Sequence, residues 1–252
     1  MEFLVEREVF SSFPGMRLAV AVAYQVANRP NASLAADWQE AWKRAGEAGA
    51  AYGNAQSHPR VSPWRQHLRA LGVSPKEFPS SIEAMLRRAL KGGSAFTINP
   101  LVDFYNMLSL RYTVPAGGFD LDEVHGPLEL RRTRVGDTFL AMDAEEVEAV
   151  PPGEVAYADG TTILTRHFVW RQARTGLIDP ATRSVFLVSE VLGEVGTDVA
   201  EMVLGELESG LRLYFGAEPV TFLLDEGSPQ ISWAEPVPIR ERSPDPRAQP
   251  GE

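Results

Sequence analysis

Cysteine is absent from this chain of 252 residues, and several kinds of site are absent with it. A disulfide framework, a thiolate nucleophile and a zinc ribbon all require cysteine side chains. Histidine is scarce as well: the chain has only His58, His67, His125 and His167, and no two of them form an H-x-x-x-H or H-E-x-x-H pair. We therefore expect no metal site and no cofactor.

The standard motifs for phosphate binding and nucleophilic catalysis are also missing. The sequence contains no G-x-S-x-G, no G-x-x-x-x-G-K-[ST] and no G-x-G-x-x-G. The sequence therefore lacks the signatures of serine hydrolases, P-loop nucleotidases and Rossmann enzymes. Gly92 and Gly93 follow a helical pattern, so they indicate the end of a helix rather than a phosphate cradle.

Long apolar runs are lacking too. No run approaches the roughly 20 residues that cross a bilayer, and residues 1–8 are acidic where a signal peptide would be basic. Apolar residues make up 44% and charged residues 23%, which is typical of globular proteins. We expect a soluble, cytoplasmic protein that has no membrane partner.

Positive charge is concentrated in one part of a chain whose net charge is −10. Residues 1–114 carry 13 basic and 9 acidic side chains, whereas residues 115–252 carry 11 and 25. Within residues 58–91 seven basic residues accompany two acidic ones, so a polyanion would meet one favourable face on a repelling molecule. Only three of the 24 basic residues are lysine, which reflects either genome composition or the suitability of arginine for phosphate.

The apolar pattern predicts a mixed α+β fold. Strands are expected over 3–10, 17–24, 128–134, 138–142, 155–158, 162–170, 184–190 and 220–224. Helices are expected over 34–45, 64–71, 81–91, 100–112 and 195–215, with a loop or frayed helix end over 46–63. Ser80 and Glu83 have the spacing of a capping box at the start of the third helix.

These elements predict a single two-lobed domain over residues 1–234, with mixed or antiparallel sheets and flanking helices. Residues 235–252 contain five prolines and almost no apolar side chains, so we expect them to form a disordered tail.

An ordered set of short motifs occupies residues 98–190. They are NPLVDFYN at 99–106, PAGGFD at 115–120, LR at 130–131, GEVAYAD at 153–159, TR at 165–166, WR at 170–171 and Thr182. In this order and spacing they resemble the B3/B4 domain of the phenylalanyl-tRNA synthetase β subunit, and most of all the freestanding B3/B4 proteins. The resemblance reaches back through 64–65, 81–83 and 87–88, and it is clearest over 64–190.

The resemblance implies a tRNA-editing module. In the synthetase this domain hydrolyses the ester of a tyrosine wrongly attached to the tRNA for phenylalanine. Its pocket lies among a Val-Asp-x-x-Asn helix, a Pro-x-His-x-Phe-Asp turn, and a later strand and loop with glycines and a glutamate. The helix and turn match here at Val102, Asp103, Asn106, Pro115, Phe119 and Asp120.

Two departures from the family pattern concern the pocket itself. Gly117 stands where the turn has its histidine, and the region of Ala173 and Arg174 has no acidic side chain where the family has its glutamate. Selectivity for tyrosine is therefore not expected to carry over. Hydrolysis remains chemically feasible, because an aminoacyl ester is already activated and backbone amides can stabilise an oxyanion.

The resemblance and the charge pattern together give three groups of site residues. The expected catalytic residues are Asn106, Gly117 and Gly118. The expected substrate-binding residues are Asp103, Tyr105, Phe119, Glu154, Arg166, Trp170 and Arg171. The expected tRNA-binding residues are Arg65, Arg69, Arg87, Arg88 and Lys91.

Structural roles compete with these assignments. Asp103 and Glu154 could hold neighbouring turns, and the two glycines could form a tight turn that needs a positive φ. The arginines could pair with nearby acidic side chains, which is the expected role of Arg131.

Two classes of function follow. The first is a trans-editing factor that binds tRNA and hydrolyses the ester of a mischarged aminoacyl-tRNA, with the amino-acid moiety in the pocket. The second is a protein that binds a free amino acid or similar small molecule without chemistry, or binds RNA without hydrolysis. DNA is not an expected partner, and the sequence does not indicate an oligomeric state.

Overall fold

The computed structural model describes residues 1–235, so the tail predicted over 235–252 lies outside the described residues apart from Glu235. The helices are α1 (Arg7–Ser12), α2 (Ala32–Ala50), α3 (Ser62–Ala70), α4 (Ser81–Ala89), α5 (Pro100–Tyr112) and α6 (Thr197–Phe215), with short 3-10 turns at Ala55–Ser57 and Leu121–Glu123. The strands are β1 (Glu2–Val5), β2 (Arg17–Ala23), β3 (Ala116–Asp120), β4 (Leu128–Arg132), β5 (Thr138–Phe139), β6 (Glu148–Ala149), β7 (Val155–Asp159), β8 (Thr162–Ile163), β9 (Thr165–Arg166), β10 (Arg171–Gln172), β11 (Val185–Val191), β12 (Val220–Leu224) and β13 (Gln230–Ser232).

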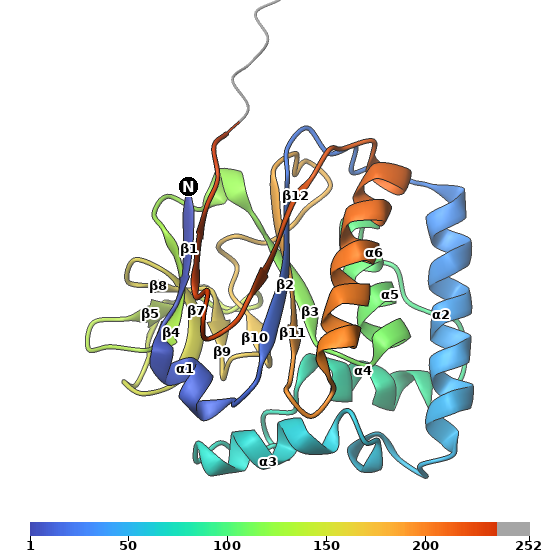
Figure 1. Ribbon diagram of the computed structural model, residues 1–252, viewed down its shortest axis with the longest axis horizontal. Helices are drawn as coiled ribbons and strands as arrows, with labels where there is room; N and C mark the ends of the chain where they lie inside the picture. The colour runs from blue at the N-terminus through green and yellow to red at the C-terminus, as the bar shows by residue number, and fades with distance from the viewer. Residues whose placement is uncertain (236–252) are drawn as a thin grey trace, which may run out of the picture.

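These elements stack in three layers (Figure 1). The middle layer is an antiparallel sheet of four strands in the order β12-β2-β11-β3. Helices α5 and α6 cover one of its faces, and α2 and α4 pack against α5. The other face packs against a mixed sheet in the order β13-β1-β4-β7-β8-β5-β6, beside which β9 and β10 pair. The predicted α+β fold with flanking helices is confirmed.

Strand β2 shows why two separate cores form. Leu18, Val20 and Val22 point into the core between the two sheets, whereas the intervening alanines at 19, 21 and 23 point toward the helices. A strand alternates its side chains between its faces, so this run is buried on both sides. Small alanine side chains let α6 lie close to the sheet.

The strand expected over 3–10 is wrong in its second half. Strand β1 ends at Val5, and Arg7–Ser12 forms α1. Within this helix Val9 and Phe10 are buried in the core between the sheets. One helical turn thus buries two adjacent apolar residues that a strand would have pointed in opposite directions.

The helix expected over 34–45 continues to Ala50, through part of the predicted loop. Asn31 caps its start by accepting from the N–H groups of Ser33 and Leu34. Its extension packs against α4 through glycines, because a Cβ at Gly46 would lie 2.8 Å from the carbonyl oxygen of Ala89. Close helix packing therefore stabilises a stretch whose composition alone favours a loop.

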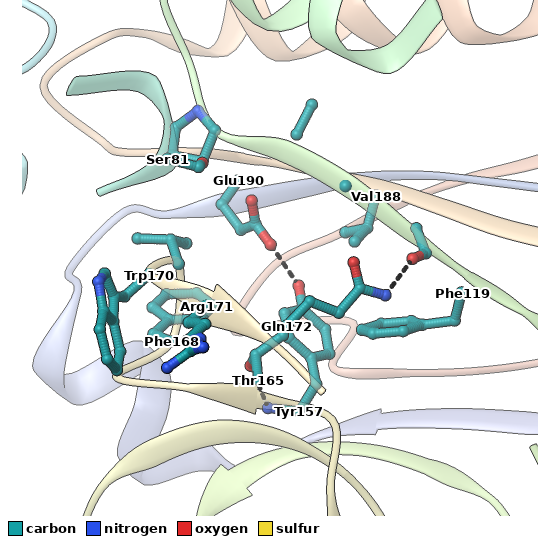
Figure 2. Close-up of a pocket in the computed structure, with 15 residues that line it drawn as sticks. Ser81, Phe119, Tyr157, Thr165, Phe168, Trp170, Arg171, Gln172, Val188 and Glu190 are labelled. Carbon is teal, nitrogen blue, oxygen red and sulfur yellow. Dashed lines mark hydrogen bonds between the residues drawn. The ribbon is translucent and has the colours of Figure 1, made fainter. Parts of the chain in front are cut away.

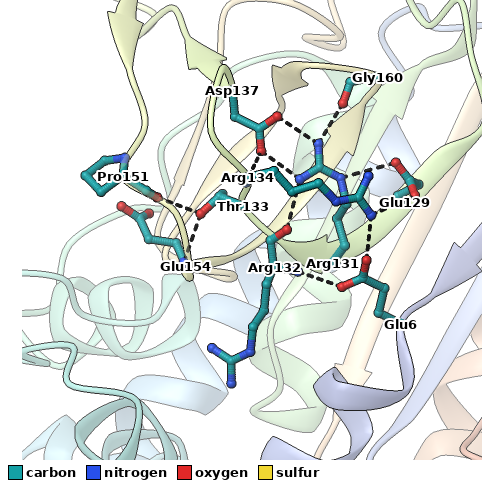
Figure 3. A network of polar contacts seen from close by, with 10 residues as sticks. All are labelled: Glu6, Glu129, Arg131, Arg132, Thr133, Arg134, Asp137, Pro151, Glu154 and Gly160. Carbon is teal, nitrogen blue, oxygen red and sulfur yellow. Dashed lines mark hydrogen bonds and ion pairs between the residues drawn. The ribbon is translucent and has the colours of Figure 1, made fainter.

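Arg131 forms the buried centre of a polar network in the second sheet (Figure 3). Its Nη1 lies 2.7 Å from Oδ2 of Asp137, and its Nε lies 3.2 Å from Oε2 of Glu129. Burial favours a raised pKa for Asp137, but hydrogen bonds from Arg131 and the Arg134 N–H outweigh it and hold that pKa below its ordinary value. The internal pairing predicted for Arg131 is confirmed.

Among residues 1–235, the structure has no helix of the length and apolar character that a bilayer crossing requires. The domain boundary at residue 234 stays a prediction.

Close packing of α5 against α6 yields a matched test of the fold. A Cβ at Gly210 would lie 2.3 Å from Cε2 of the buried Phe104 ring, whereas a Cβ at Gly205, on the same helix, has no atom within 4 Å. We expect Gly210→Ala to lower the free energy of unfolding by about 1–3 kcal/mol through overpacking. Gly205→Ala should raise it by about 0.5–1 kcal/mol through helix propensity.

Urea unfolding followed by circular dichroism measures both changes. Equal effects of the two substitutions would contradict the packing of α6 on α5.

Candidate functional site

A small hollow of about 90 Å³ opens between the two sheets at the edge of β3 (Figure 2). That volume holds several water molecules. Its lining comes from the first turn of α4, from β3 and β11, and from β7 and the β9–β10 hairpin. The lining residues are Ser81, Pro115, Ala116, Gly117, Gly118, Phe119, Tyr157, Thr165, Phe168, Val169, Trp170, Arg171, Gln172, Val188 and Glu190.

Gly117 creates part of this hollow by having no side chain. It pairs with Val188 of β11, and its neighbour Phe119 points into the core between the sheets. Because side chains alternate along a strand, position 117 points to that same face. A Cβ built there meets no atom within 4 Å, so the space is open.

Gly118 offers backbone groups to the hollow. Strand β3 pairs with β11 on one side only, and its outward carbonyls need other donors. The carbonyl of Gly118 accepts from Nε2 of Gln172 at 3.0 Å, so it points away from β11. The N–H of a strand residue lies on the same side as its carbonyl. The Gly118 N–H therefore points toward the lining supplied by Gln172.

Glu190 is a buried acid in the same lining. It follows Phe186 and Val188 on one face of β11, and only 3% of its surface is exposed. The Tyr157 hydroxyl donates to its Oε1 at 2.6 Å, whereas its Oε2 is buried without a partner among residues 1–235. Burial raises the pKa of Glu190 to about 7, against the opposing effect of the Tyr157 hydrogen bond.

A strained turn forms the opposite wall. The strand expected over 162–170 is wrong at this point, because His167 and Phe168 have φ angles of +48° and +65°. Two consecutive left-handed residues are costly and reverse the chain. The turn is held by the Ser81 N–H, which donates to the carbonyl of Val169 at 2.8 Å. Phe168, Val169 and Trp170 of this turn line the hollow.

Glu154 and Arg166 lie behind this turn and not among the residues that line the hollow. Their side chains form an ion pair at 2.6 Å, and His167 Nδ1 lies 3.3 Å from the same carboxylate. Burial lowers the pKa of His167, although the charge of Glu154 opposes the shift. These contacts give Glu154 the structural role of anchoring the turn.

Five of the predicted residues meet at the hollow: Gly117, Gly118, Phe119, Trp170 and Arg171. Arg171 stands at its rim, paired with Asp143 and with its guanidinium 5.9 Å from the Trp170 ring centre.

The predicted residues of α5 do not line this hollow. Helix α5 packs on the helical side of the four-stranded sheet, with Asp103 and Asn106 buried there and Tyr105 partly buried. Asp103 Oδ1 accepts from the Ile98 N–H at 2.9 Å, and burial raises the pKa of this carboxyl. Asp103 therefore has the structural role given above as its alternative, because it holds the turn before α5. Asn106 does not line the hollow, and its catalytic role stays a prediction.

Sequence reasoning missed Glu190, Tyr157 and Gln172. The available signal for Glu190 was one acidic residue within VFLVSEV, a run with five apolar residues and one serine. Tyr157 and Gln172 carry no such signal, because their roles depend on partners far away in the sequence.

The predicted tRNA-binding residues differ in exposure and in pairing, and only Arg65 is not exposed. Arg65 and Arg87 both pair with the buried carboxylate of Glu83, each at 2.7 Å, and Arg65 is largely buried. Arg69, Arg88 and Lys91 are exposed. The Ser80 hydroxyl accepts from the Glu83 N–H, so one half of the predicted capping box forms. The Glu83 side chain is instead engaged by the two arginines.

Comparisons with known proteins agree on one family. Residues 63–202 match the model of the B3/4 domain family. The phenylalanine–tRNA ligase beta subunit of Nitrobacter winogradskyi is 30% identical over 124 residues, which are 48% of this chain and 15% of that subunit. The subunit of the same name from Chromobacterium violaceum is 27% identical over 106 residues, which are 42% of this chain and 13% of that subunit.

A solved N-terminal fragment of the phenylalanyl-tRNA synthetase beta subunit from Pyrococcus horikoshii aligns with a TM-score of 0.42 and 9% identity, over 88% of this chain and 54% of that fragment. The chain spans 15% or less of the length of the two curated relatives it matches.

The buried acid predicts a pH-dependent stability. The folded state keeps a proton on Glu190 up to about pH 7, whereas the unfolded chain releases it near pH 4.5. The folded state binds more protons in this window, so the contribution of Glu190 to stability falls as the pH rises. Between pH 4.5 and 8 the free energy of unfolding of Glu190→Gln should rise by about 3 kcal/mol relative to the wild type.

Urea titrations across this range test the expectation, with Glu226→Gln at an exposed turn as the matched control. A difference between wild type and Glu190→Gln that stays constant with pH would contradict the burial of this acid.

Proposed function

The chain belongs to the B3/4 domain family, and we propose that it acts as a trans-editing factor that binds a mischarged aminoacyl-tRNA and hydrolyses its ester. The observation that carries this proposal is the hollow at the edge of β3, which combines a backbone donor, a buried acid and aromatic walls. The names of its relatives, ligases for phenylalanine and tRNA, support tRNA as the partner. Such a role belongs to translation quality control in the cytoplasm.

The hollow offers groups suited to ester hydrolysis. Water must add to the ester carbonyl and lose a proton, so that negative charge develops on the carbonyl oxygen. The bond to the ribose oxygen then breaks, and the ribose leaves as a hydroxyl by taking up a proton. The N–H of Gly118 is a donor on the pocket side of β3 and can stabilise that charge. Both donor contacts of the Gln172 amide go to carbonyls of Gly118 and Gly176, which leaves its oxygen to accept from water.

Exposed cations lie a short distance from the hollow. Helix α4 begins at Ser81, in the pocket lining, and Arg88 follows seven residues later, about 10 Å along the helix axis. Lys91 follows the helix and is also exposed. We propose that these two residues, with Arg69 on α3, contact tRNA phosphates while the amino acid enters the hollow.

A second candidate function is binding of an amino acid without hydrolysis. The lining contains no histidine, and its one carboxyl already accepts from the Tyr157 hydroxyl. Glu190 is therefore the one carboxyl or imidazole in the described lining that could act as a general base, and one of its two oxygens is engaged by Tyr157. If no tRNA is deacylated, this composition of the lining favours a protein that binds an amino acid without hydrolysing an ester.

Filling the hollow should abolish editing. Gly117→Leu adds a side chain into open space, and Gly205→Leu places the same side chain on the exposed face of α6. In a panel of mischarged tRNAs, we expect the wild type to accelerate release of at least one amino acid. Gly117→Leu should slow that release roughly tenfold or more, because the ester can no longer be positioned, and Gly205→Leu should leave it unchanged.

Thermal melts establish that both variants are folded. If the wild type accelerates no deacylation in the panel, the hydrolytic proposal is wrong, and amino-acid binding by the wild type alone would favour the second candidate.

Phosphate contact predicts a dependence of tRNA affinity on salt. Replacing Arg88 and Lys91 together by alanine should weaken tRNA binding and reduce the slope of log K against log salt by about 1.5. The matched control replaces Lys43 and Arg44 by alanine, since these two exposed cations lie on α2. Filter binding at several salt concentrations measures both slopes, and equal slopes for the two double variants would rule out contact at the end of α4.

A further inference from the structure

Glu190 lines the hollow and has one carboxyl oxygen without a hydrogen-bond partner among the described residues. Its Oε1 accepts from the Tyr157 hydroxyl, while Oε2 is buried with no partner among residues 1–235. In Figure 2 the carboxylate lies next to the Tyr157 hydroxyl, among the side chains that line the pocket. A buried polar atom without a partner is rare in folded proteins, and this oxygen can accept a hydrogen bond that the described residues do not supply.

The carboxylate also lacks a counter-charge. None of the salt bridges within residues 1–235 includes Glu190. Arg171 is the one cation among the lining residues, and its guanidinium pairs with Asp143 at the rim. Burying a carboxylate without an opposite charge is costly, and a single neutral donor such as the Tyr157 hydroxyl offsets only part of that cost.

A primary ammonium group matches both deficits. It carries three N–H donors and one positive charge, whereas a hydroxyl supplies a donor without the charge. The aromatic rings of Phe119, Tyr157 and Phe168 line the same hollow, and aromatic faces attract cations. A methylene chain attached to the ammonium would pack against these rings and Val188.

We propose that Glu190 binds a primary ammonium group of the ligand, so that the hollow selects amino compounds over their hydrocarbon counterparts. The inference rests on the proposed function to the extent that the ligand is an amino-acid moiety. In such a ligand the ammonium is either the α-amino group or an amine at the end of the side chain. Glu190 thereby acts as a specificity residue, while the Gly118 N–H faces the carbonyl.

Four amides of one five-carbon acid test the proposal. They are pentanamide, 2-aminopentanamide, 5-aminopentanamide and 2,5-diaminopentanamide, which differ only in the presence and position of the amine. Amides are not esters of the kind that the proposed reaction cleaves, so calorimetry at pH 7 measures occupancy of the hollow independently of hydrolysis. We expect at least one amine-bearing amide to bind roughly tenfold or more tightly than pentanamide.

Tighter binding of 2-aminopentanamide identifies the α-ammonium as the bound group. Tighter binding of 5-aminopentanamide identifies the side-chain ammonium. Glu190→Gln keeps the shape of the side chain and removes its charge, so the preference should fall to about twofold or less. Tyr157→Phe keeps the charge and should retain the preference. Thermal melts confirm that each variant is folded. The comparison of the four amides on the wild-type protein tests the proposal even if a variant fails to fold.

The proposal is overturned if pentanamide binds the wild type as tightly as the three amines, if none of the four binds, or if the preference survives Glu190→Gln. Failure of the editing function is distinguishable, because an amine preference without deacylation of any tRNA would retain the role of Glu190. Deacylation without an amine preference would remove this inference alone.

Discussion

The missing side chain at position 117 is the constraint on which the site depends. Two sheets packed face to face normally fill the space between them with side chains. Here β3 is the edge strand of its sheet, and the open position at Gly117 leaves a hollow where β3 faces the β9–β10 hairpin. Every other feature of the site borders that hollow: the amide of Gly118, the carboxyl of Glu190 and the aromatic wall of the strained turn.

The rest of the fold makes this arrangement rigid. Strand β11 carries Glu190 and is paired with β2 along its whole length and with β3 as far as Ser189, so the carboxyl has little freedom to move toward solvent. The turn at His167 and Phe168 is held from two sides, by the start of α4 and by the pairing of Glu154 with Arg166. Burial of an acid without a counter-charge and two residues in left-handed conformations both cost stability. Costs of this kind at one location are typical of a binding or catalytic site.

Much of the fold could be predicted from sequence, because local signals determine it. The helix expected over 100–112 has those bounds in the structure, since Asn99 caps the Val102 N–H and Pro100 occupies the first turn. The glycine pair and Trp170-Arg171 were placed at the site through the order of their motifs. Glu190 was not among the predicted site residues, and the pairing of Arg65 was not predicted, because their contacts depend on Tyr157 and Glu83, which lie 33 and 18 residues away. No periodicity encodes such pairings.

The central claim is that an amino-acid group enters the hollow beside Gly117 and Gly118. Amide NMR of the labelled protein tests it most directly, during titration with an adenosine that carries an amino acid in a non-hydrolysable amide linkage at its 3′ position. The account predicts that the largest shift changes occur at Gly117, Gly118 and residues 168–172. Changes confined to α2, α5 and α6, or no changes at saturating ligand, would contradict it.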